Sequence, residues 1–458
     1  MPNYLTYPEY SNSGIDWLGG VPRHWEYFRL RFLLAENFAN GLFKKSHFWG
    51  EGIKIVNVGD VYTENDMVSQ ANLDRVDCND DELEKYQVQN GDFFVVRSSL
   101  KLQGIGKSAV ILHPEETTVF ECHLIRGRPT GFVHPRFLNL LLNSHYSREY
   151  FVANANVVTM ATIDQNKLKD IELFIPEYEE QQTIARFLDH KTRQIDQLIA
   201  KKQTLIDKLN EQRIALITHA VTKGLNPDVE MKDSGVEWLG DVPKHWDVRR
   251  LKFVTESFGG GTPNTAIDLY WNGDIPWVSP KDMKSRKITQ TQDNITQLGL
   301  EESTSRMINE NTVLIVVRSG ILRHSIPVAI NLVPVSINQD MKALVPNESL
   351  LSPHYLQFFI EGNQKDLLDA WSKQGCTVES IESDYMLNSV MVLPPVEEQT
   401  QIVEYLDGKM ARIDRMIELN QRTIDKLKEY RTALITAAVT GKIDVRNWQQ
   451  EKYNHATP

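Results

Sequence analysis

The sequence reads Ser13-Gly-Ile-Asp-Trp17-Leu-Gly-Gly-Val-Pro22-Arg-His-Trp25 near its beginning and Ser234-Gly-Val-Glu-Trp238-Leu-Gly-Asp-Val-Pro243-Lys-His-Trp246 near its middle. Trp17 and Trp238 stand 221 positions apart. A second pair of similar segments, 179–222 and 397–440, repeats at an offset of 218. A unit of this length can bury a core of its own, unlike the short unit of a solenoid. The chain therefore contains two copies of one unit, which suggests that the protein acts on a two-fold target.

The composition is that of a globular protein. The chain has 458 residues, of which 24% are charged and 41% hydrophobic, and this predicts roughly two to four domains. No apolar run approaches the roughly 20 residues that a membrane helix needs, and the first residues lack a basic and apolar signal region. We therefore expect a soluble, cytoplasmic protein with no membrane partner.

Cysteines and net charge limit the kinds of site. Cys78, Cys122 and Cys376 are widely separated and lack CxxC spacing, so neither a disulfide framework nor a zinc site is indicated. The net charge of −11 at first counts against a nucleic-acid partner, because phosphate binding requires positive potential. Local basic clusters matter more than this sum.

Each half divides into a strand-rich region and a helical region, which together predict an α+β protein. Short apolar runs bounded by Gly, Asp and Pro predict strands; these are Ile53–Val58, Phe93–Val96, Val110–Leu112, Ile275–Val278, Val313–Val317 and Val328–Val333. Each strand-rich region also includes one helical stretch, around 137–146 and around 355–359. The predicted divisions are strand-rich regions over 1–176 and 224–394, helices over 177–223 and 395–441, and a tail over 442–458.

The two helical regions are predicted to be long helices that pack on each other. Glu179 to Val221 contains no Gly or Pro, and Gly224 and Pro227 follow as a stop signal. A helix of about 40 residues spans roughly 60 Å, which one small domain cannot cover. We therefore expect an antiparallel coiled coil with an internal pseudo-two-fold repeat, although each helix packing on its own domain remains the alternative. Apolar positions at 3–4 spacing define the expected interface: Ile195, Leu198, Leu205, Leu209, Leu216, Ile413, Met416, Leu427, Tyr430 and Leu434.

Three features occur together in a specific order. They are the paired Trp-Leu-Gly-x-Val-Pro-x-His-Trp segments, the stretch from Gly259 to Val278, and the Glu-Glu-Gln that opens each helical region. In this order the chain resembles the specificity subunit of a type I restriction-modification system, over nearly its whole length. The resemblance implies that the strand-rich regions are target recognition domains, each reading one half of a split sequence in double-stranded DNA. It also implies that the helices are spacers and that the chain itself is not an enzyme.

The resemblance further implies partners. Two modification subunits would methylate adenine with S-adenosylmethionine, and two restriction subunits would use ATP and magnesium to translocate and cut. No cofactor or metal is then expected on this chain, and the partners would supply much of the positive potential around DNA.

Candidate DNA contacts follow from residue chemistry. Arginine can pair with guanine O6 and N7, whereas serine and lysine more often hold phosphate oxygens. Val95–Ser99 and Val316–Gly320 occupy similar places, so each half is expected to deliver an arginine and hydroxyls from a strand into a loop. The candidates there are Arg97, Ser98, Ser99, Lys101, Lys107, Arg318, Ser319, Arg323 and His324. Two further clusters are phosphate candidates: Lys44, Lys45, Lys281, Lys284, Arg286 and Lys287. For any single one of them, an ordinary solvated loop remains the alternative.

The two halves also diverge. Asn338-Gln-Asp340 is matched by Phe120-Glu-Cys122, and Gly259–Pro263 has no good counterpart near Glu36–Gly41. If both regions read DNA, the two half-sites should differ, which makes the target asymmetric.

Enzymatic interpretations fit less well. Pro394-Pro395 lacks the polar residue of a methyltransferase motif, and Gly106-Lys107-Ser108 lacks the rest of a phosphate-binding loop. Asp189-His-Lys191 and Asp407-Gly-Lys409 are expected to be helix surface charge. The repeated His24 and His245 are expected to be structural hydrogen-bond anchors near the helices. A coiled-coil adaptor whose strand-rich regions bind protein remains the alternative of a different class.

Overall fold

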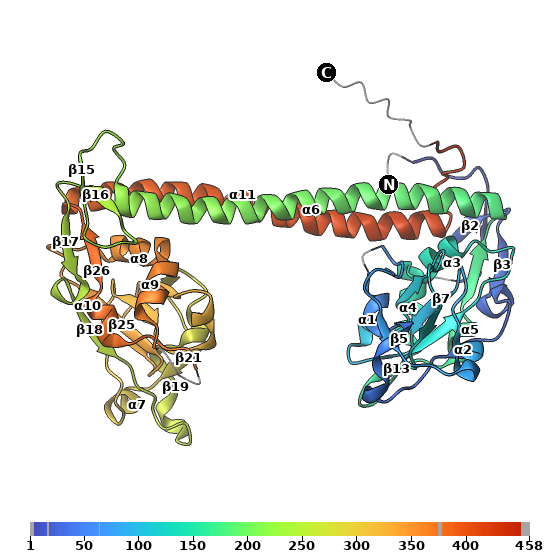
Figure 1. The fold of residues 1–458 in the computed structure, drawn as a ribbon, viewed down its shortest axis with the longest axis horizontal. Helices are drawn as coiled ribbons and strands as arrows, with labels where there is room; N and C mark the ends of the chain where they lie inside the picture. Colours follow the sequence, from blue (N-terminus) through green and yellow to red (C-terminus); the bar gives the residue numbers. More distant parts are fainter. Residues whose placement is uncertain (1–3, 16–17, 64, 374–377, 450–458) are drawn as a thin grey trace. The chain divides into compact units, whose positions relative to one another are not determined.

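The computed structural model describes residues 4–15, 18–63, 65–373 and 378–449 (Figure 1). Two residues named above, Trp17 and Cys376, lie outside these ranges. The chain divides into two compact units, residues 1–203 with 422–458, and residues 204–421. Each unit contains one strand-rich domain and a stretch of both long helices. No helix among the described residues is long and apolar enough to span a membrane.

Among the described residues, the first unit contains five sheets. Two of them have two strands each: β1 (Tyr10–Asn12) pairs with β2 (Gly20–Pro22), and β14 (Glu172–Ile175) pairs with β3 (Glu26–Arg29). The other three are larger. The first has the strand order β4 (Ala39–Asn40), β11 (Leu124–Gly127), β7 (Phe93–Val96), β9 (Ser108–Val110). The second has the order β10 (Thr118–Phe120), β5 (Trp49–Val56), β6 (Asp74–Val76). The third has the order β12 (Asn156–Val157), β13 (Ala161–Thr162), β8 (Ser98–Ser99). β7 is apolar at every position because both of its faces are covered. Phe93 and Val95 belong to one core, and Phe94 and Val96 to another.

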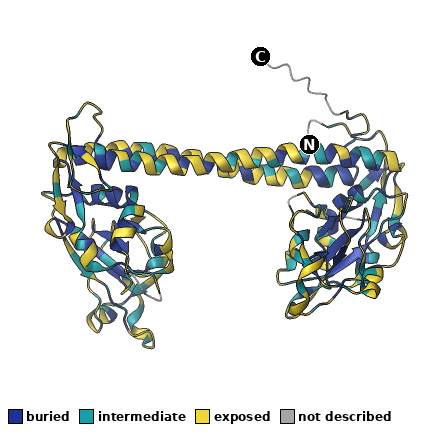
Figure 2. Ribbon diagram, viewed as in Figure 1, coloured by how far each residue is buried: buried dark blue, intermediate teal, exposed yellow. Residues whose placement is uncertain are grey.

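Helices join the first of these cores to the long helices. α3 (Pro135–Leu142) contributes Phe137 and Leu138 to the core that contains Ile184 and Phe187 of α6 (Tyr178–Lys223). The single helical stretch predicted around 137–146 is two helices, because Ser144 begins α4 (His145–Ala153) and caps it by accepting the Ser147 N–H at 3.4 Å. Figure 2 shows the buried residues of each unit gathered in its sheets and on the helices that cover them.

The second unit repeats the design. One larger sheet has the strand order β18 (Thr255–Gly259), β25 (Met341–Pro346), β22 (Val313–Val316), β23 (Val328–Asn331), β20 (Lys287–Ile288), and the other has the order β21 (Asp293–Ile295), β19 (Trp271–Val278), β24 (Ser336–Ile337). In two smaller sheets, β15 (Met231–Asp233) pairs with β16 (Asp241–Pro243), and β17 (Asp247–Arg250) pairs with β26 (Val390–Leu393). Its short helices are α8 (Pro353–Gly362), α9 (Gln364–Trp371) and α10 (Ser383–Asn388). Even an irregularity is repeated: Trp49 and Ile53 both face Val76, and Trp271 and Ile275 both face Ile295. The duplication seen in the sequence is therefore a duplication of the fold.

The long helices α6 and α11 (Val396–Val439) run antiparallel within each unit. In the first unit, Arg431 donates to Asp196 at 3.0 Å, while Gly441, beyond the end of α11, lies against Trp25, which is bonded to Glu180. Going forward along α11 thus goes backward along α6. In the second unit, Arg213 pairs with Asp414, and Gly224 lies beside Glu398. The predicted antiparallel helix pair is confirmed within each unit.

The helix interface is displaced from part of the predicted stripe. Ile195, Leu209, Ile413 and Leu434 are buried, and Leu216 and Leu427 are half-buried. Leu198, Leu205, Met416 and Tyr430 are each more than a third exposed, and Ile206 and Ile424 are buried instead. A straight helix drifts relative to a strict 3.5-residue repeat, so one stripe of positions cannot stay in contact along the whole length.

The repeated sequence motifs fasten each domain to a long helix. His24 Nε2 lies 2.8 Å from Glu180 Oε2, and Trp25 Nε1 donates to Glu180 Oε1 at 3.1 Å. His245 and Trp246 bond Glu398 at the same two distances. The expectation that both histidines are structural anchors near the helices is confirmed.

The glutamine of each Glu-Glu-Gln segment also joins its domain to the long helix. Gln181 accepts the His134 N–H at 2.7 Å and donates to the Pro176 carbonyl at 2.8 Å. Gln399 accepts the Ser352 N–H at 2.8 Å and donates to the Pro394 carbonyl at 2.9 Å. Both glutamine side chains are buried, so these hydrogen bonds satisfy groups that water cannot reach.

The beginning of the predicted tail belongs to the first domain. Ile443 and Val445 are buried in its core, and Asp444 forms a β-bridge with Leu5. The division predicted at 442 is therefore wrong for residues 442–448, because their apolar side chains complete this core.

Candidate nucleic-acid interface

Three polar side chains converge where β7 ends in the first unit. Arg97 follows β7 directly, and its guanidinium Nη1 donates to Asn40 Oδ1 at 3.1 Å. The Gln165 side chain, at the start of α5 (Gln165–Lys169), donates to the same oxygen at 3.1 Å. Asn40 is exposed, and Arg97 and Gln165 are half-buried. Arginine can bond guanine, and Asn or Gln can bond adenine, so this cluster has the chemistry of a base reader.

Sequence reasoning did not find Asn40 or Gln165. They stand 57 and 68 positions from Arg97, and neither lies in a basic or repeated segment. Only the pairing of β4 with β11, and of β11 with β7, brings Asn40 to Arg97.

The turn at Glu121–His123 lies beside this cluster. The Arg97 N–H donates to the His123 carbonyl at 3.0 Å, and Glu121 accepts backbone N–H groups of Val58 and His123, each at 3.2 Å. Side-chain atoms of Glu121, Cys122 and His123 lie within 4.8 Å of one another, close enough to share a metal ion. Burial, and then the Glu121 carboxylate, raise the pKa of the Cys122 thiol, which opposes the thiolate that a metal needs. Because Glu121 already holds two backbone groups, we assign this turn a structural role.

The other candidates of the first unit fall into three groups. Lys107 forms an ion pair with the buried Asp66, and Lys44 lies 2.8 Å from Glu82, whose pKa it lowers. These two lysines are therefore engaged within the domain. Lys45 and Lys101 are exposed. Ser98 and Ser99 are half-buried and pair with Thr162 and Ala161 in the β12-β13-β8 sheet.

At this strand exit, the strand pairing aligns the two units one residue differently from the similar sequence segments, which align Arg97 with Arg318. Val96 pairs with Leu124, and Val316 pairs with Met341. The next residues then match: the Arg97 carbonyl accepts the Ile163 N–H at 3.0 Å, and the Val317 carbonyl accepts the Ile381 N–H at 2.8 Å.

Val317 thus occupies the place of Arg97, and Arg318 occupies the place of Ser98. The predicted equivalence of Arg97 and Arg318 is wrong, because similarity of sequence does not report strand pairing. Successive side chains of a strand point to opposite faces, so the two arginines leave their strands on different faces.

The second unit places different polar groups at the site of the Arg97 cluster. Gly259 of β18 pairs with Lys342, as Asn40 of β4 pairs with Ile125. The Lys342 ammonium donates to Ser383 Oγ at 2.6 Å, and Ser383 begins α10 as Gln165 begins α5. Burial lowers the pKa of Lys342. A lysine and a serine thus stand where the first unit has arginine, asparagine and glutamine.

Gly259–Pro263 does have a counterpart in the first unit. The Leu42 N–H donates to the Phe120 carbonyl at 2.8 Å, and the Gly261 N–H donates to the Ile337 carbonyl at 3.0 Å. A Cβ at Gly41 or at Gly260 would overlap backbone carbonyl oxygens of the adjacent turn. The expected lack of a counterpart is therefore wrong: a glycine is needed at both places because the backbone passes too close for a side chain.

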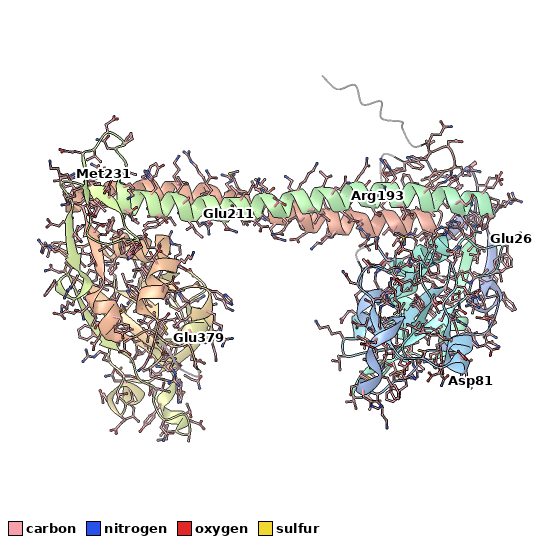
Figure 3. All side chains as sticks on the ribbon, viewed as in Figure 1. Glu26, Asp81, Arg193, Glu211, Met231 and Glu379 are labelled. Atoms are coloured by element: carbon pink, nitrogen blue, oxygen red, sulfur yellow. The ribbon has the colours of Figure 1, made fainter. Side chains whose placement is uncertain are left out.

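The remaining candidates of the second unit lie on its surface. Arg318 and His324 are exposed, and Ser319 is half-buried. Arg323 pairs with Glu379, which is labelled in Figure 3, and this hydrogen bond lowers the pKa of Glu379.

Lys281, Lys284 and Lys287 are exposed, whereas Arg286 is engaged within the unit. Arg286 donates to Glu361 at 2.8 Å, and its guanidinium lies 4.2 Å from the centre of the Phe358 ring. These contacts join Arg286 to α8 and favour a structural role.

The two Asp-x-Lys segments lie in ion pairs of the scaffold. Asp189 accepts from the buried Arg136 at 2.9 Å, and Asp407 lies 3.9 Å from Arg286. Both carboxylates face an arginine of their own domain, as expected of charges on a helix surface.

Comparison with known proteins relates this arrangement to a family. The model of the type I restriction modification DNA specificity domain matches residues 22–210 and 243–429. The EcoR124I/EcoR124II specificity subunit of Escherichia coli is 35% identical over 259 residues, which are 54% of this chain and 58% of that relative. The MjaIX specificity subunit of Methanocaldococcus jannaschii is 30% identical over 182 residues, which are 39% of this chain and 40% of that relative. The chain thus spans less than two thirds of the length of either relative.

A solved structure supports the same fold. A chain from work on complex assembly and conformational transition of the type I R-M system superimposes with a TM-score of 0.69 and 15% identity, over 92% of this chain and 99% of that one. Both domain models lie on the two structural repeats described above, with the long helices at their C-terminal ends.

Proposed function

The chain belongs to the family of type I restriction-modification DNA specificity subunits, and on this premise we propose that it supplies the sequence specificity of such a complex. Each strand-rich domain reads one half of a split target in double-stranded DNA. The chain performs no chemistry and positions the subunits that do.

One observation carries the proposal that the target is asymmetric. The two domains are alike in the design of their cores, in the Trp–Glu hydrogen bond to the long helix and in a strand irregularity. They differ in the polar side chains at one corresponding position on the surface. That place holds Arg97, Asn40 and Gln165 in one domain and Lys342 with Ser383 in the other. Donors and acceptors of different geometry select different bases, so the half-sites differ.

The basic candidates divide by role. We assign base contacts to Arg97, which directly follows the central strand β7, and to the exposed Arg318, which stands two residues beyond the central strand β22. The exposed lysines hold phosphates and set the register on DNA; they are Lys45, Lys101, Lys281, Lys284 and Lys287.

The partners proposed are modification subunits that bind S-adenosylmethionine and restriction subunits that bind ATP and magnesium, two of each. The net charge of −11 supports shared DNA binding, because an acidic chain needs positive potential from its partners to hold DNA firmly.

The test is to map methylated bases in a host that carries the complete system. Arg97→Ala should change or relax one half of the methylated sequence, and Arg318→Ala the other half, while the subunits still assemble. Arg23→Ala is a matched control, because Arg23 is exposed and pairs only with Glu9 among the described residues. An unchanged sequence for both variants would favour an adaptor whose domains bind protein instead.

A further inference from the structure

Three apolar side chains at one end of a small sheet in the first unit are strongly exposed. Leu100, Val157 and Val158 expose 86%, 63% and 91% of their surface. We call these three residues the apolar tip. Single exposed apolar residues are ordinary, but a group of them on one sheet marks a contact surface.

The strand pairing brings the three residues of the apolar tip to the same end of the β12-β13-β8 sheet. Val157 pairs with Ala161, and Ala161 pairs with Ser99 across the β12-β13-β8 sheet. Leu100 follows Ser99, and Val158 opens the turn that returns to Met160, whose carbonyl accepts the Val158 N–H at 3.5 Å. In Figure 1, β13 lies at the end of the domain away from the long helices.

Among the described residues, the hydrophobic cores of the first unit do not include the apolar tip. Ala161, in the central strand of this sheet, is buried in the core, and the tip residues extend beyond it into solvent. Leaving these side chains in water forgoes the favourable free energy of burial, unless a partner covers them.

The surroundings of the apolar tip indicate the partner. Arg97 and Ser98 precede Leu100, and the exposed Lys101 follows it. Asn156 and Thr162 lie opposite each other and next to Ser98, in the adjacent row of the sheet. Basic, hydroxyl and amide groups around an apolar centre fit the DNA major groove, where the C5 methyl of thymine is the apolar group that a base pair presents.

We propose that the apolar tip packs on thymine methyl groups in the half-site read by the first domain. This inference rests on the proposed function. This contact is apolar and involves no arginine or lysine. It requires at least one A·T pair in that half-site.

The second domain differs from the first at the place of Leu100. Ser319 occupies the place of Ser99 in the second unit, so Gly320 occupies the place of Leu100. A Cβ at Gly320 would meet no other atom within 4 Å, so that place is open. The second domain therefore lacks the leucine that completes the apolar tip.

The test removes methyl groups from the DNA and side chains from the protein. Methylation mapping first identifies the half-site that changes with Arg97→Ala. The full-length chain with its modification subunit is then titrated with duplexes in which each thymine of that half-site is replaced in turn by deoxyuridine. At one or more positions, wild-type binding should weaken roughly fourfold, as expected for loss of one buried methyl group.

The double variant Leu100→Ser with Val158→Ser should bind the normal duplex more weakly and should no longer distinguish thymine from deoxyuridine. Both side chains are exposed, so its thermal unfolding should match that of the wild type. Phe32→Ser, at a side chain of 64% exposure elsewhere in the same unit, is the control and should keep the sensitivity to the methyl group.

Wild-type binding that is indifferent to every substitution, or a half-site without an A·T pair, would overturn the inference. So would a double variant that keeps the full sensitivity. In each of these cases the complex still selects its sequence, so the proposed function stands. If the wild-type complex shows no sequence preference, the proposed function itself fails.

Discussion

The Tyr7 hydroxyl donates a 2.6 Å hydrogen bond to Glu180 Oε1, at the first turn of α6. Glu180 thus holds three side chains of the first domain, because His24 and Trp25 bond the same carboxylate. The place of Tyr7 in the repeat is taken by Asp228, which is exposed. The two otherwise similar fastenings therefore differ in strength.

We predict that Glu180→Ala lowers the free energy of unfolding of the first unit by about 2–3 kcal/mol, and that Glu398→Ala lowers that of the second by about 1–2 kcal/mol. Glu180 is also the more buried of the two, with 9% of its side chain exposed against 26% for Glu398. Hydrogen exchange read from peptides of each unit would measure both effects. A larger loss in Glu398→Ala would contradict the argument.

Asn40 is predicted to position Arg97. Asn40→Ala removes the oxygen that receives the guanidinium, so Arg97 loses its fixed orientation while its charge remains. Discrimination at the base read by Arg97 should fall roughly tenfold, within the range that one bidentate contact contributes. The measurement is the methylated fraction of sites that differ at one base of the first half-site. Asn37→Ala is the control, because Asn37 is exposed on the same segment and bonds Lys169 instead. An equal loss in the control would show that Asn40 has no special part.

Two nearby lysines should behave differently. Lys101→Ala should weaken binding to all DNA sequences and reduce the salt slope by about one unit, because an exposed phosphate contact is lost. Lys107→Met should instead destabilise the first unit by about 2–4 kcal/mol, since it leaves the buried Asp66 without its ion-pair partner. Salt-dependent binding and urea unfolding of both variants separate the two roles. A reduced salt slope in Lys107→Met, with normal stability, would reassign that lysine to DNA.

The first unit should lose stability as the pH falls below about 6.5, the ordinary histidine value. Burial lowers the pKa of His134, whose Nδ1 accepts the Phe137 N–H at 3.4 Å and caps α3. Between the lowered pKa and the ordinary value, the unfolded chain binds a proton that the folded chain does not, so stability rises with pH. The stability that the neutral His134 contributes is fully present above the ordinary histidine pKa, and it is lost as the pH falls through the lowered pKa of His134.

His134→Asn keeps a capping side chain and removes the titrating group. Urea unfolding at pH 5, 6 and 7 should therefore show a smaller pH dependence in this variant. An unchanged dependence would assign the effect to other groups, among which His354 of the second unit also has a pKa lowered by burial.

Local patterns predicted much of the fold. β7 is observed over the predicted residues 93–96, because a short run of apolar β-formers has one outcome when it is covered on both faces. α6 covers the predicted 177–223 except for its first residue, since no Gly or Pro interrupts it and Gly224 stops it. The break before α4 was not predicted because it takes only two residues, Asn143 as the C-cap of α3 and Ser144 as the N-cap of α4.

The site was harder to predict than the fold. Arg97 could be proposed from its place after a strand, but Asn40 and Gln165 reach it only through pairing between strands that are distant in sequence. The correspondence of Arg318 to Arg97 looked secure from similar neighbours, yet hydrogen-bond ladders decide correspondence and are invisible in a single sequence. Leu100 and Val158 could not be singled out, because their exposure follows from how a small sheet extends beyond the core.

The one-residue difference in register between Arg97 and Arg318 has an evolutionary consequence. If a strand shifts along itself after a single residue is inserted or deleted in the loop before it, every side chain of the strand and of the residues that follow moves to the opposite face. A strand such as β7, which is apolar at every position and covered on both faces, keeps apolar side chains in both cores after such a shift. After a gene duplication, such a small event would give one copy a new recognition surface without costing it a stable core. Divergent specificity can thus arise in one mutational step, ahead of any substitution among the contact residues themselves.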